Sequence, residues 1–530
     1  MDIDDFFPHF ANDAIHSRFL RKRPPVCYSP GSILLRQGHD MRIRINFAKR
    51  YAVLAAAFLF TVQAAFAQND NTPSAQKIAD KVDEYMNAAV KNDQFSGSVL
   101  VAKDGSPFVS KGYGMANYEL NVPNTPKTVF RIASLTKQFT AMAIVQLQER
   151  GKLNVGDSIC RYLEDCPSAW QPVTIRHLLT HTSGIKNYSS LPDWDDRISR
   201  LPYTRTEFVK VFRDIPLQFS PGEKFAYSNS GYYLLGLIIE RVSGKRYQEF
   251  LRENIFGPLA MKNSGYADPP TLIPNRATGY YWASNSFVNA PLLNLKLSFA
   301  GGGIYSTTED MLLWDKALYT EKLVSRKSLE EIFTPFLGGY AYGWRIVKMH
   351  GRTMAGHSGS FDGFSTFIAR FPSERTTIIV LSNSDRTSAA KVSKDIAAIV
   401  FGDSYELPKP QISDVLSLAL AQRGIDAAER EFREILRERA ADYNLGNQEK
   451  AINELGYALL EEQRVKEAIR IFTLNVELAP RSANAHDSLA EAYMLNGDKP
   501  MAIAHYARSL ELDPANQNAI KMLEKLRKMN

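Results

Sequence analysis

The sequence predicts an α+β domain, in which an antiparallel sheet is flanked by helices and joined to a helical subdomain, followed by an all-α domain. Three observations carry this prediction. Residues 75–402 have strand-like sequence patterns at both ends and helical patterns between them. The β-rich sequence stops at a proline-containing segment at 404–411, and the sequence after it repeats every 34 residues. Strands from the two ends pair most simply in one sheet with helices on its faces.

The N-terminal region has the pattern of an export signal. From Met41 a charged segment, MRIRINFAKR, leads through an apolar stretch, YAVLAAAFLFTV, to QAAFA, which predicts cleavage after Ala67. About 12 apolar residues fall short of the roughly 20 that span a bilayer, so no stable membrane span is expected after cleavage. We therefore expect a periplasmic or secreted protein, with 41–67 as signal peptide and 1–40 as a non-native upstream extension.

The formal net charge of +7 does not indicate a nucleic-acid partner. Residues 1–67 hold 9 Lys and Arg against 5 Asp and Glu, which accounts for +4, and the remainder contains no basic run. The composition, 45% hydrophobic and 23% charged, is ordinary for a folded soluble protein. No metal-ligand cluster is visible in the sequence, so neither a metal nor another cofactor is expected.

Two of the three cysteines form a candidate disulfide. Cys27 falls in the upstream extension, which leaves Cys160 and Cys166 as an even pair in an exported protein. A short-loop disulfide is one interpretation, and two reduced thiols in a partly buried loop are the other.

The elements of the first domain, residues 68–405, follow from local patterns. Apolar spacing over 75–93 predicts a helix, and alternation around Asp104-Gly105 predicts a β-hairpin. Near the end of the domain, strands are predicted for YAYGWRIVKM, STFIARF and TTIIVLSN, and a helix is expected at 388–401.

The second domain, residues 412–530, is repetitive. Matching residues stand 34 positions apart at Leu455/Leu489, Ala468/Ala502, Phe472/Tyr506 and Pro480/Pro514, and Ala428 and Phe432 mark a weaker earlier unit. This period and these residue types resemble the tetratricopeptide repeat, a pair of helices that packs closely at its small residue. The resemblance implies a stack ending in a capping helix, QNAIKMLEKLRKM, with a concave surface for a protein or peptide partner.

A serine followed by a lysine one helical turn later is the first candidate for chemistry. The serine needs a neighbouring base, and S-x-x-K places an amine within reach of its oxygen. The motif occurs four times, at Ser74/Lys77, Ser134/Lys137, Ser183/Lys186 and Ser388/Lys391. Only Ser134 opens a long apolar helical run, at the end of the helix where a developing oxyanion is favoured, so Ser134 and Lys137 are the predicted pair.

Two later motifs supply further polar groups. FAYSNSGYY contains Tyr227 and Asn229 as Y-x-N, and AGHSGSFDGF contains His357 and Gly359 as H-x-G, which we expect between two strands. Taken singly, each residue has an ordinary structural explanation, as a packing aromatic, a turn residue or a strand histidine. Their joint occurrence downstream of S-x-x-K favours a catalytic site.

SLTK, YSN and HSG, in this order, resemble the active-site motifs of the class C β-lactamase and penicillin-binding-protein family of serine hydrolases. HLLTHTSGI at 177–185 and FAGGGIYSTTEDM at 299–311 are also similar to sequences of that family, and the resemblance spans roughly 75–402. It implies a β-lactamase/DD-peptidase-like fold.

The resemblance also implies roles for the motif residues. Ser134 would be acylated, and Lys137 would share a proton-transfer network with Tyr227, whose phenol we expect to have a pKa lowered enough to act as base. Asn229 would orient the substrate amide. The backbone N–H groups of Ser134 and Ser360 would form an oxyanion hole, and Gly359 fits a strand that substrate approaches closely.

His357 separates this sequence from typical β-lactamases. Many relatives of that kind carry lysine at this motif position, a permanent cation for a substrate carboxylate, whereas a histidine is only partly charged near neutral pH. The expected function is therefore an exported serine hydrolase of D-amino-acid peptides, β-lactams or esters, similar to D-Ala-D-Ala carboxypeptidases and esterases. A class C-like β-lactamase and a catalytically weak penicillin-binding adaptor acting through the repeats are the alternatives.

Other polar and aromatic residues receive no catalytic role. His177 and His181 are expected to be structural. Trp344 and the aromatics Tyr280, Tyr281 and Trp282 fit either a cleft wall or ordinary packing.

Overall fold

The computed structural model describes residues 75–528, apart from 196, 268–270, 284, 292–293 and 447. The predicted signal peptide, its cleavage site and the extension at 1–40 lie outside this range, as does Cys27. Within the described part of the chain, no helix combines the length and apolar character that crossing a bilayer requires.

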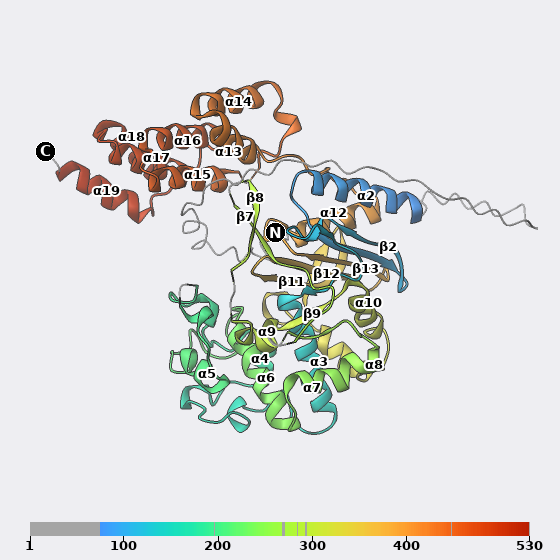
Figure 1. Ribbon diagram of the computed structural model, residues 1–530. Helices are drawn as coiled ribbons and strands as arrows, with labels where there is room; N and C mark the ends of the chain where they lie inside the picture. Colours follow the sequence, from blue (N-terminus) through green and yellow to red (C-terminus); the bar gives the residue numbers. More distant parts are fainter. Residues whose placement is uncertain are drawn as a thin grey trace, which may run out of the picture.

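A six-stranded antiparallel sheet forms the centre of the first domain (Figure 1). Its order is β10-β11-β12-β13-β1-β2, so a strand from near the start of the domain pairs with one from near its end. The strands are β1 Gly97–Lys103, β2 Ser106–Tyr113, β10 Arg345–Met349, β11 Arg352–Phe361, β12 Phe364–Phe371 and β13 Thr376–Ser382. This sheet confirms the predicted α+β class.

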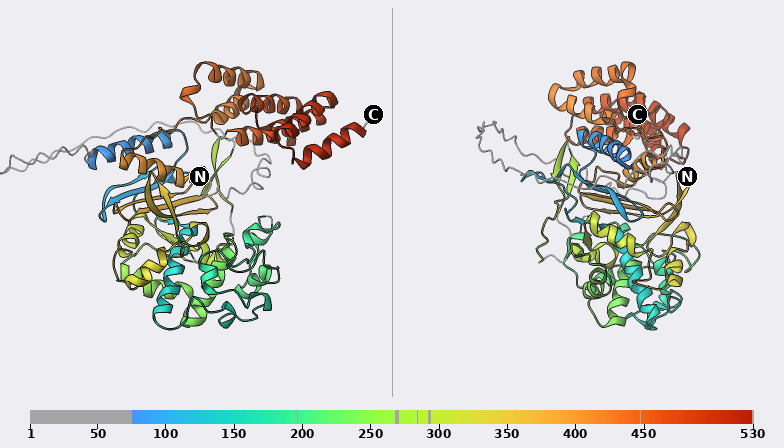
Figure 2. Two further views of the ribbon diagram at one scale, coloured as in Figure 1. Left: turned by 180° about the vertical axis from the view of Figure 1, so that it is seen from behind. Right: turned by 90° about the vertical axis from the view of Figure 1, so that its right-hand side faces the viewer.

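Both faces of the sheet are covered. Val99 and Val101 of β1 pack with α2 (Ala75–Lys91) and α12 (Ala389–Phe401), whereas Leu100 belongs to the core of the helical subdomain. The views in Figure 2 place α2 and α12 on one side of the sheet and the subdomain on the other. The predicted helices at 75–93 and 388–401 are thereby confirmed to within two residues at their ends.

The helical subdomain lies between β2 and β10 in the chain. Its main helices are α3 Thr136–Glu149, α4 Ile175–Leu179, α5 Arg205–Arg213, α6 Asn229–Ser243, α7 Tyr247–Leu251, α8 Gly257–Leu259, α9 Phe299–Gly302, α10 Thr308–Ala317 and α11 Arg326–Phe333. The same region holds short strands, β3 Met115–Asn117, β4 Val122–Pro123, β5 Phe130–Arg131, β6 Gly265–Tyr266, β7 Tyr280–Ala283, β8 Ser286–Asn289 and β9 Ile304–Ser306.

Two strand predictions were wrong in detail. Only the second half of YAYGWRIVKM is a strand, because Gly343 takes a φ of 77° and the Ala341 N–H bonds back to the Trp344 carbonyl, which makes a turn. The H-x-G motif lies inside β11 and not between two strands. Its backbone is therefore held in register with β12 along its whole length.

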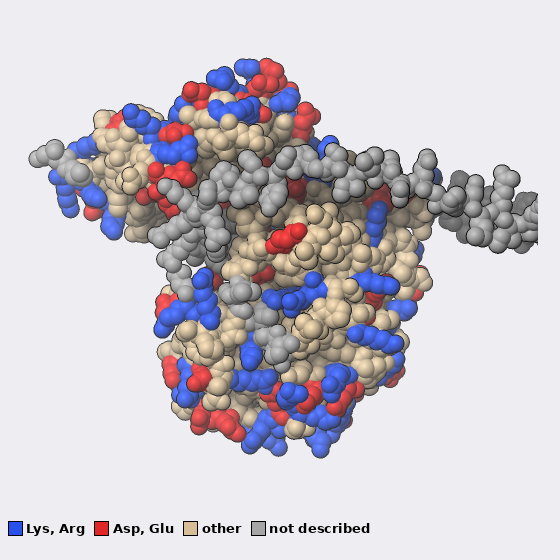
Figure 3. Space-filling model, in the orientation of Figure 1, with Lys and Arg blue, Asp and Glu red and all other residues tan. Residues whose placement is uncertain are grey.

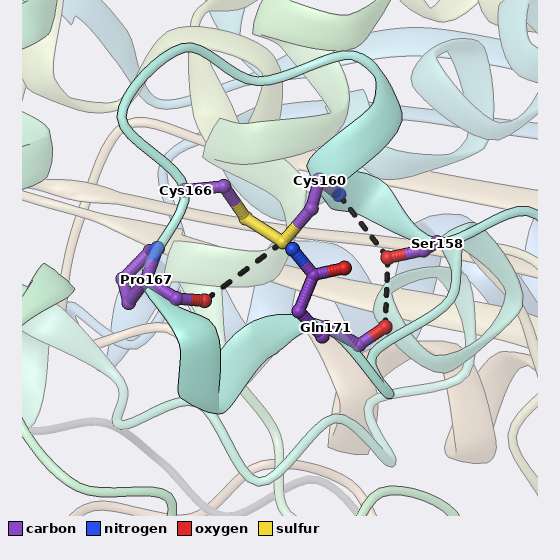
Figure 4. Close-up of a disulfide and its surroundings, with 5 residues drawn as sticks. All are labelled: Ser158, Cys160, Cys166, Pro167 and Gln171. Carbon is purple, nitrogen blue, oxygen red and sulfur yellow. Dashed lines mark hydrogen bonds between the residues drawn. A yellow bond between two sulfur atoms is a disulfide. The ribbon is translucent and has the colours of Figure 1, made fainter.

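Cys160 and Cys166 form a disulfide, with Cα atoms 5.2 Å apart (Figure 4). Ser158 orders the adjoining loop, since its hydroxyl accepts from the Cys160 N–H at 3.4 Å and donates to the Gln171 carbonyl at 2.8 Å. Of the two interpretations of the cysteine pair, the structure has the disulfide.

The C-terminal domain is a stack of antiparallel helices (Figure 1). They are α13 Ile412–Arg423, α14 Ile425–Glu438, α15 Glu449–Glu461, α16 Val465–Leu478, α17 Ala483–Leu495, α18 Lys499–Leu512 and α19 Gln517–Lys528. The repeat residues Ala468, Phe472, Ala502 and Tyr506 are fully buried, and burial of the two alanines agrees with the close helix packing expected at the small repeat position. Close approach is visible at Gly456, where a Cβ would overlap the Phe472 ring.

An ion pair joins the two domains. Arg386, in the loop before α12, is almost buried and pairs with Asp414 of α13. The face of the molecule in Figure 3 shows basic and acidic side chains interspersed, both on the repeats and on the helical subdomain. On that face, the described residues form no extended surface of a single sign.

Candidate active site

Ser134 lies on a 3-10 turn, Ala133–Leu135, that leads directly into α3. Ala133 has a φ of 48°, in the left-handed region that non-glycine residues rarely adopt, which makes the chain turn sharply before the serine. Ser134 is partly exposed, whereas Leu135 and Lys137 are fully buried. The turn therefore presents the Ser134 hydroxyl at the start of a buried helix.

Lys137 is the centre of the polar cluster. Its Nζ lies 3.0 Å from Ser134 Oγ, 2.8 Å from Asn229 Oδ1 and 2.8 Å from the Gly301 carbonyl oxygen. These three oxygens occupy the three hydrogen-bonding directions of the amine. Burial lowers the pKa of Lys137 well below its usual range, because an ammonium loses hydration there.

Tyr227 lies beside the same two residues. Its phenol hydrogen-bonds to Ser134, and the Lys137 nitrogen lies 4.9 Å from the centre of its ring. The expectation of a lowered tyrosine pKa was wrong in direction. Burial raises the pKa of Tyr227 above its usual value of 10 and outweighs the lowering by the Ser134 hydrogen bond and the charge of Arg345.

Asn229 is the first residue of α6, and its carboxamide is held at both ends. Its Oδ1 accepts from Lys137, its Nδ2 donates to Ser189 Oγ at 3.2 Å, and its backbone N–H donates to Asn187 Oδ1 at 3.0 Å. Asn229 therefore positions the lysine. Asn187 and Ser189, which hold Asn229 in turn, were not foreseen from the sequence.

His357 is buried in β11 and has a defined tautomer. Its Nδ1 lies 2.6 Å from the Ser358 carbonyl oxygen, which only accepts, so Nδ1 carries the proton. Its Nε2 then accepts from the Tyr340 hydroxyl at 2.8 Å. Burial, together with the charge that Lys137 carries when it is protonated, lowers the pKa of His357 to about 3, so the expected partial charge near neutral pH was wrong, and the ring is neutral.

The buried His357 makes the stability of the fold depend on pH. Between about pH 3 and 6.5 the unfolded chain binds a proton here and the folded chain does not, so stability falls as the pH falls. We expect His357 to remove about 2 kcal/mol of unfolding free energy between pH 7.5 and 5.0. Urea unfolding at both pH values, for the wild type and for His357→Gln, measures this loss, and equal pH dependence in the two proteins would contradict it.

Gly359 is required by the protein's own backbone. A Cβ there would overlap the Ile132 carbonyl oxygen and Thr366 Oγ1. Thr366 Oγ1 also donates to Ile132 O at 3.0 Å, which ties β12 to the segment before Ser134. Close approach of β11 to the Ser134 turn therefore accounts for the glycine, and close approach by substrate stays a prediction. Ser360, the next residue, is exposed.

Gly359→Ala is expected to destabilise the fold by about 1–3 kcal/mol, because overpacking forces the strand away from the turn. Thermal unfolding and the rate of Ser134 labelling by a fluorophosphonate measure the two consequences. Gly231→Ala is the matched control, since a Cβ at that buried helical glycine meets its neighbours no closer than 3.5 Å. Equal stability and labelling rates in the two variants would contradict the assignment.

The family model described as Beta-lactamase matches residues 78–401, well over half of the 530 residues. The chain belongs to the beta-lactamase family. A second model, Tetratricopeptide repeat, matches residues 483–516 and confirms the resemblance of the C-terminal domain.

Relatives and solved structures agree with the family. Penicillin-binding protein 4* of Bacillus subtilis (strain 168) is 33% identical over 342 residues, which is 60% of this chain and 74% of that protein. A penicillin-binding protein structure from Bacillus halodurans is 31% identical with a TM-score of 0.53, covering 62% of this chain and 99% of that one. The octameric penicillin-binding protein homologue from Pyrococcus abyssi is 29% identical with a TM-score of 0.55, and the match covers 65% of this chain and 81% of that one. The chain is thus a serine hydrolase.

This beta-lactamase family member has further residues at the site that the sequence did not single out. Tyr340 bonds His357, and the Arg345 guanidinium lies 5.8 Å from the centre of the Tyr340 ring and 5.0 Å from that of Phe225. The positive charge of Arg345 lowers the pKa values of Tyr227 and His357. For Arg345 the available signal was the β10–β11 hairpin, which pairs this residue with Gly356, the neighbour of the H-x-G histidine.

His181 packs behind Tyr227. It is fully buried, its ring centre lies 4.2 Å from that of Tyr227, and its Nδ1 accepts from the Ser228 backbone N–H at 3.1 Å. It holds the Y-x-N segment in place, in line with a structural role. His177 is also structural, since it forms a capping box with Thr174 at the start of α4.

The remaining candidates lie in the scaffold. Trp344 is fully buried against Phe333, Tyr280 is buried, and Trp282 stacks with Arg386. Among the other S-x-x-K serines, Ser388 caps α12 and Ser183 bonds the Ile185 backbone, while Ser74 lies outside the described residues. Within the described part of the chain, no three metal-ligating side chains gather.

Proposed function

We propose that the chain hydrolyses D-amino-acid peptides and related esters through an acyl-serine intermediate at Ser134, in the manner of a D-Ala-D-Ala carboxypeptidase or esterase. The observation that carries this proposal is the position of Lys137 Nζ, 3.0 Å from Ser134 Oγ and hydrogen-bonded on its other sides to two carbonyl oxygens.

Lys137 acts as the base in its neutral form. A neutral amine has two N–H groups and one lone pair. Gly301 O and Asn229 Oδ1 only accept hydrogen bonds, so they take the two N–H groups and leave the lone pair facing Ser134. The amine accepts the serine proton as Oγ attacks the substrate carbonyl carbon.

Tyr227 acts as the proton donor. Its raised pKa keeps the phenol protonated at neutral pH, and its hydrogen bond to Ser134 places it at the reacting oxygen. When the bond to the leaving group breaks, the phenol protonates that group, and the proton held by Lys137 restores the phenol. Water then repeats the sequence in reverse, releasing the acid and Ser134.

The backbone N–H groups of Ser134 and Ser360 serve as the oxyanion hole. β10 pairs with β11 only as far as Gly356, so the half of β11 that carries Ser360 has no strand on its outer edge within the described residues. This edge runs past the Ser134 turn, to which the bond from Thr366 to Ile132 holds it. Donors fixed in this way stabilise developing charge without reorganising.

Arg345 supplies the substrate-binding charge that the third motif lacks. His357 is neutral, whereas a guanidinium remains charged at neutral pH. Arg345 lies at the Gly356 end of β11, where it meets the carboxylate of the leaving amino acid. The relatives described as penicillin-binding proteins support a substrate of this class.

A matched pair of peptides tests this function. We expect a peptide ending in D-Ala-D-Ala to be cleaved about 10–100-fold more efficiently than its C-terminal amide, because a charged hydrogen bond contributes about 1.5–3 kcal/mol. Arg345→Met should remove that preference and leave cleavage of the amide within about threefold. Equal kcat/KM values for the acid and the amide would contradict the proposed function. Turnover of a chromogenic cephalosporin faster than that of the peptide would favour the β-lactamase alternative.

The site is proposed to work outside the cytoplasm, in the periplasm or medium, after removal of 41–67. The repeats are proposed to bind a protein or peptide partner beside it, which the match to the tetratricopeptide model supports. Fractionation of cells expressing the full sequence, with N-terminal sequencing of the mature protein, tests export. A cytoplasmic protein that keeps residues 41–67 would contradict it.

A further inference from the structure

Arg131, three residues before Ser134, is a half-buried cation to which no described residue offers a hydrogen-bond acceptor. Its guanidinium lies 5.5 Å from the centre of the Phe361 ring and 5.8 Å from that of Phe364. Among the described residues, no hydrogen bond or ion pair holds that guanidinium. The two ring faces that it contacts do not replace the hydrogen bonds that an arginine makes in water.

The charges around Arg131 do not neutralise it. Asp362 lies close enough to act on it electrostatically, but the Asp362 carboxylate accepts the Tyr281 hydroxyl at 2.6 Å. Arg276 adds a second positive charge nearby. Burial lowers the pKa of Arg131 to about 10, so it still carries its charge at neutral pH.

A small pocket opens beside this guanidinium. Seven residues line it: Arg131, Ala267, Ser298, Gly302, Gly303, Ile304 and Phe361. The pocket adjoins the site, because Gly302 packs near the Ala133 backbone and the preceding carbonyl, that of Gly301, accepts from Lys137.

The position of the pocket along β11 assigns it to one side of the substrate. Arg345 pairs with Gly356 at one end of the strand segment that passes the nucleophile, and Arg131 lies on Phe361 at the other. Ser360, the proposed oxyanion donor, lies between these ends. A substrate whose leaving-group carboxylate meets Arg345 therefore extends its acyl part towards Arg131.

We propose that Arg131 and this pocket bind a carboxylate carried by the acyl part of the substrate. The planar guanidinium fork matches a carboxylate with two parallel hydrogen bonds, and Ser298, which also lines the pocket, carries a hydroxyl that can act as a further donor. The proposal rests on acyl transfer at Ser134, and it adds a second anionic group to the preferred substrate, on the acyl side of the scissile bond.

Two esters with the same leaving group isolate this subsite. p-Nitrophenyl hydrogen glutarate carries a terminal acyl carboxylate and p-nitrophenyl hexanoate does not, and p-nitrophenolate offers no carboxylate to Arg345. With buffer rates subtracted, Arg131→Met should lower kcat/KM about 10–100-fold for the glutarate ester and less than about threefold for the hexanoate. Arg131→Lys should retain part of the preference. Lys327→Met, an exposed charge on α11, should change neither.

The outcomes separate this subsite from the proposed function. Equal losses on both esters, or a wild type that prefers neither, with Ser134 labelled by a fluorophosphonate, would overturn the subsite alone. Absence of both ester hydrolysis and Ser134 labelling would overturn the proposed function as well. If Arg131→Met does not fold, Arg131→Lys and inhibition of the wild type replace it. Free glutarate should then inhibit hydrolysis of the hexanoate ester more strongly than pentanoate does. Equal inhibition by the two acids would refute the subsite.

Discussion

Replacing Ser134 by alanine is expected to lower kcat/KM by about 10⁴-fold or more on every substrate that is turned over. The loss is this large because the hydroxyl forms the covalent bond, and without it the remaining groups only bind and polarise the substrate. Lys137 would keep its carbonyl partners Gly301 and Asn229, so the fold should be retained. Steady-state kinetics on a D-Ala-D-Ala peptide and a p-nitrophenyl ester measure the effect.

Ser388→Ala is the matched control for this substitution. Ser388 also stands three residues before a lysine, but it caps α12 by accepting from the Lys391 N–H. Its loss should cost about 1 kcal/mol of stability and leave kcat/KM unchanged. Retention of more than a tenth of the activity by Ser134→Ala would show that the nucleophile is elsewhere.

Replacing Lys137 by either methionine or arginine is expected to lower the acylation rate by roughly 10²–10⁴-fold, the usual contribution of a positioned base. The arginine variant decides between two roles. It keeps a positive charge but does not lose its proton, so it restores electrostatic stabilisation and not base catalysis. Stopped-flow acylation by a fluorescent penicillin or a p-nitrophenyl ester gives the rates.

The control for the lysine is Lys391→Met, which removes an exposed amine paired with Asp395 at the same S-x-x-K spacing. Its acylation rate should match the wild type. Substantial activity in Lys137→Arg would instead assign the base to Tyr227 and make Lys137 an electrostatic partner. In that case Tyr227→Phe would show the larger loss.

The sequence predicted the parts of the site that local geometry determines. Ser134 and Lys137 lie within hydrogen-bonding distance because three residues make nearly one helical turn, and the sheet was predictable from alternating runs at both ends of the domain. The repeat period predicted close helix packing at the small residues Ala468 and Ala502, and both are fully buried.

The errors concern properties that arise only in three dimensions. Whether Tyr227 or Lys137 has the lowered pKa depends on burial and on the partners that surround each group, and the carbonyl of Gly301 is distant from both in the chain. The contact of Gly359 with Ile132 and the approach of Arg345 to Tyr340 depend on which strands pair. No spacing rule along the chain contains that information.

The position of a covalent label tests the central claim most directly. The intact protein, treated with a fluorescent penicillin or a fluorophosphonate and digested, should carry the label on the peptide that contains Ser134, and Lys137→Arg should slow its appearance. Label on any other serine, or no modification of Ser134 by either reagent, would contradict an acyl-serine mechanism at this site.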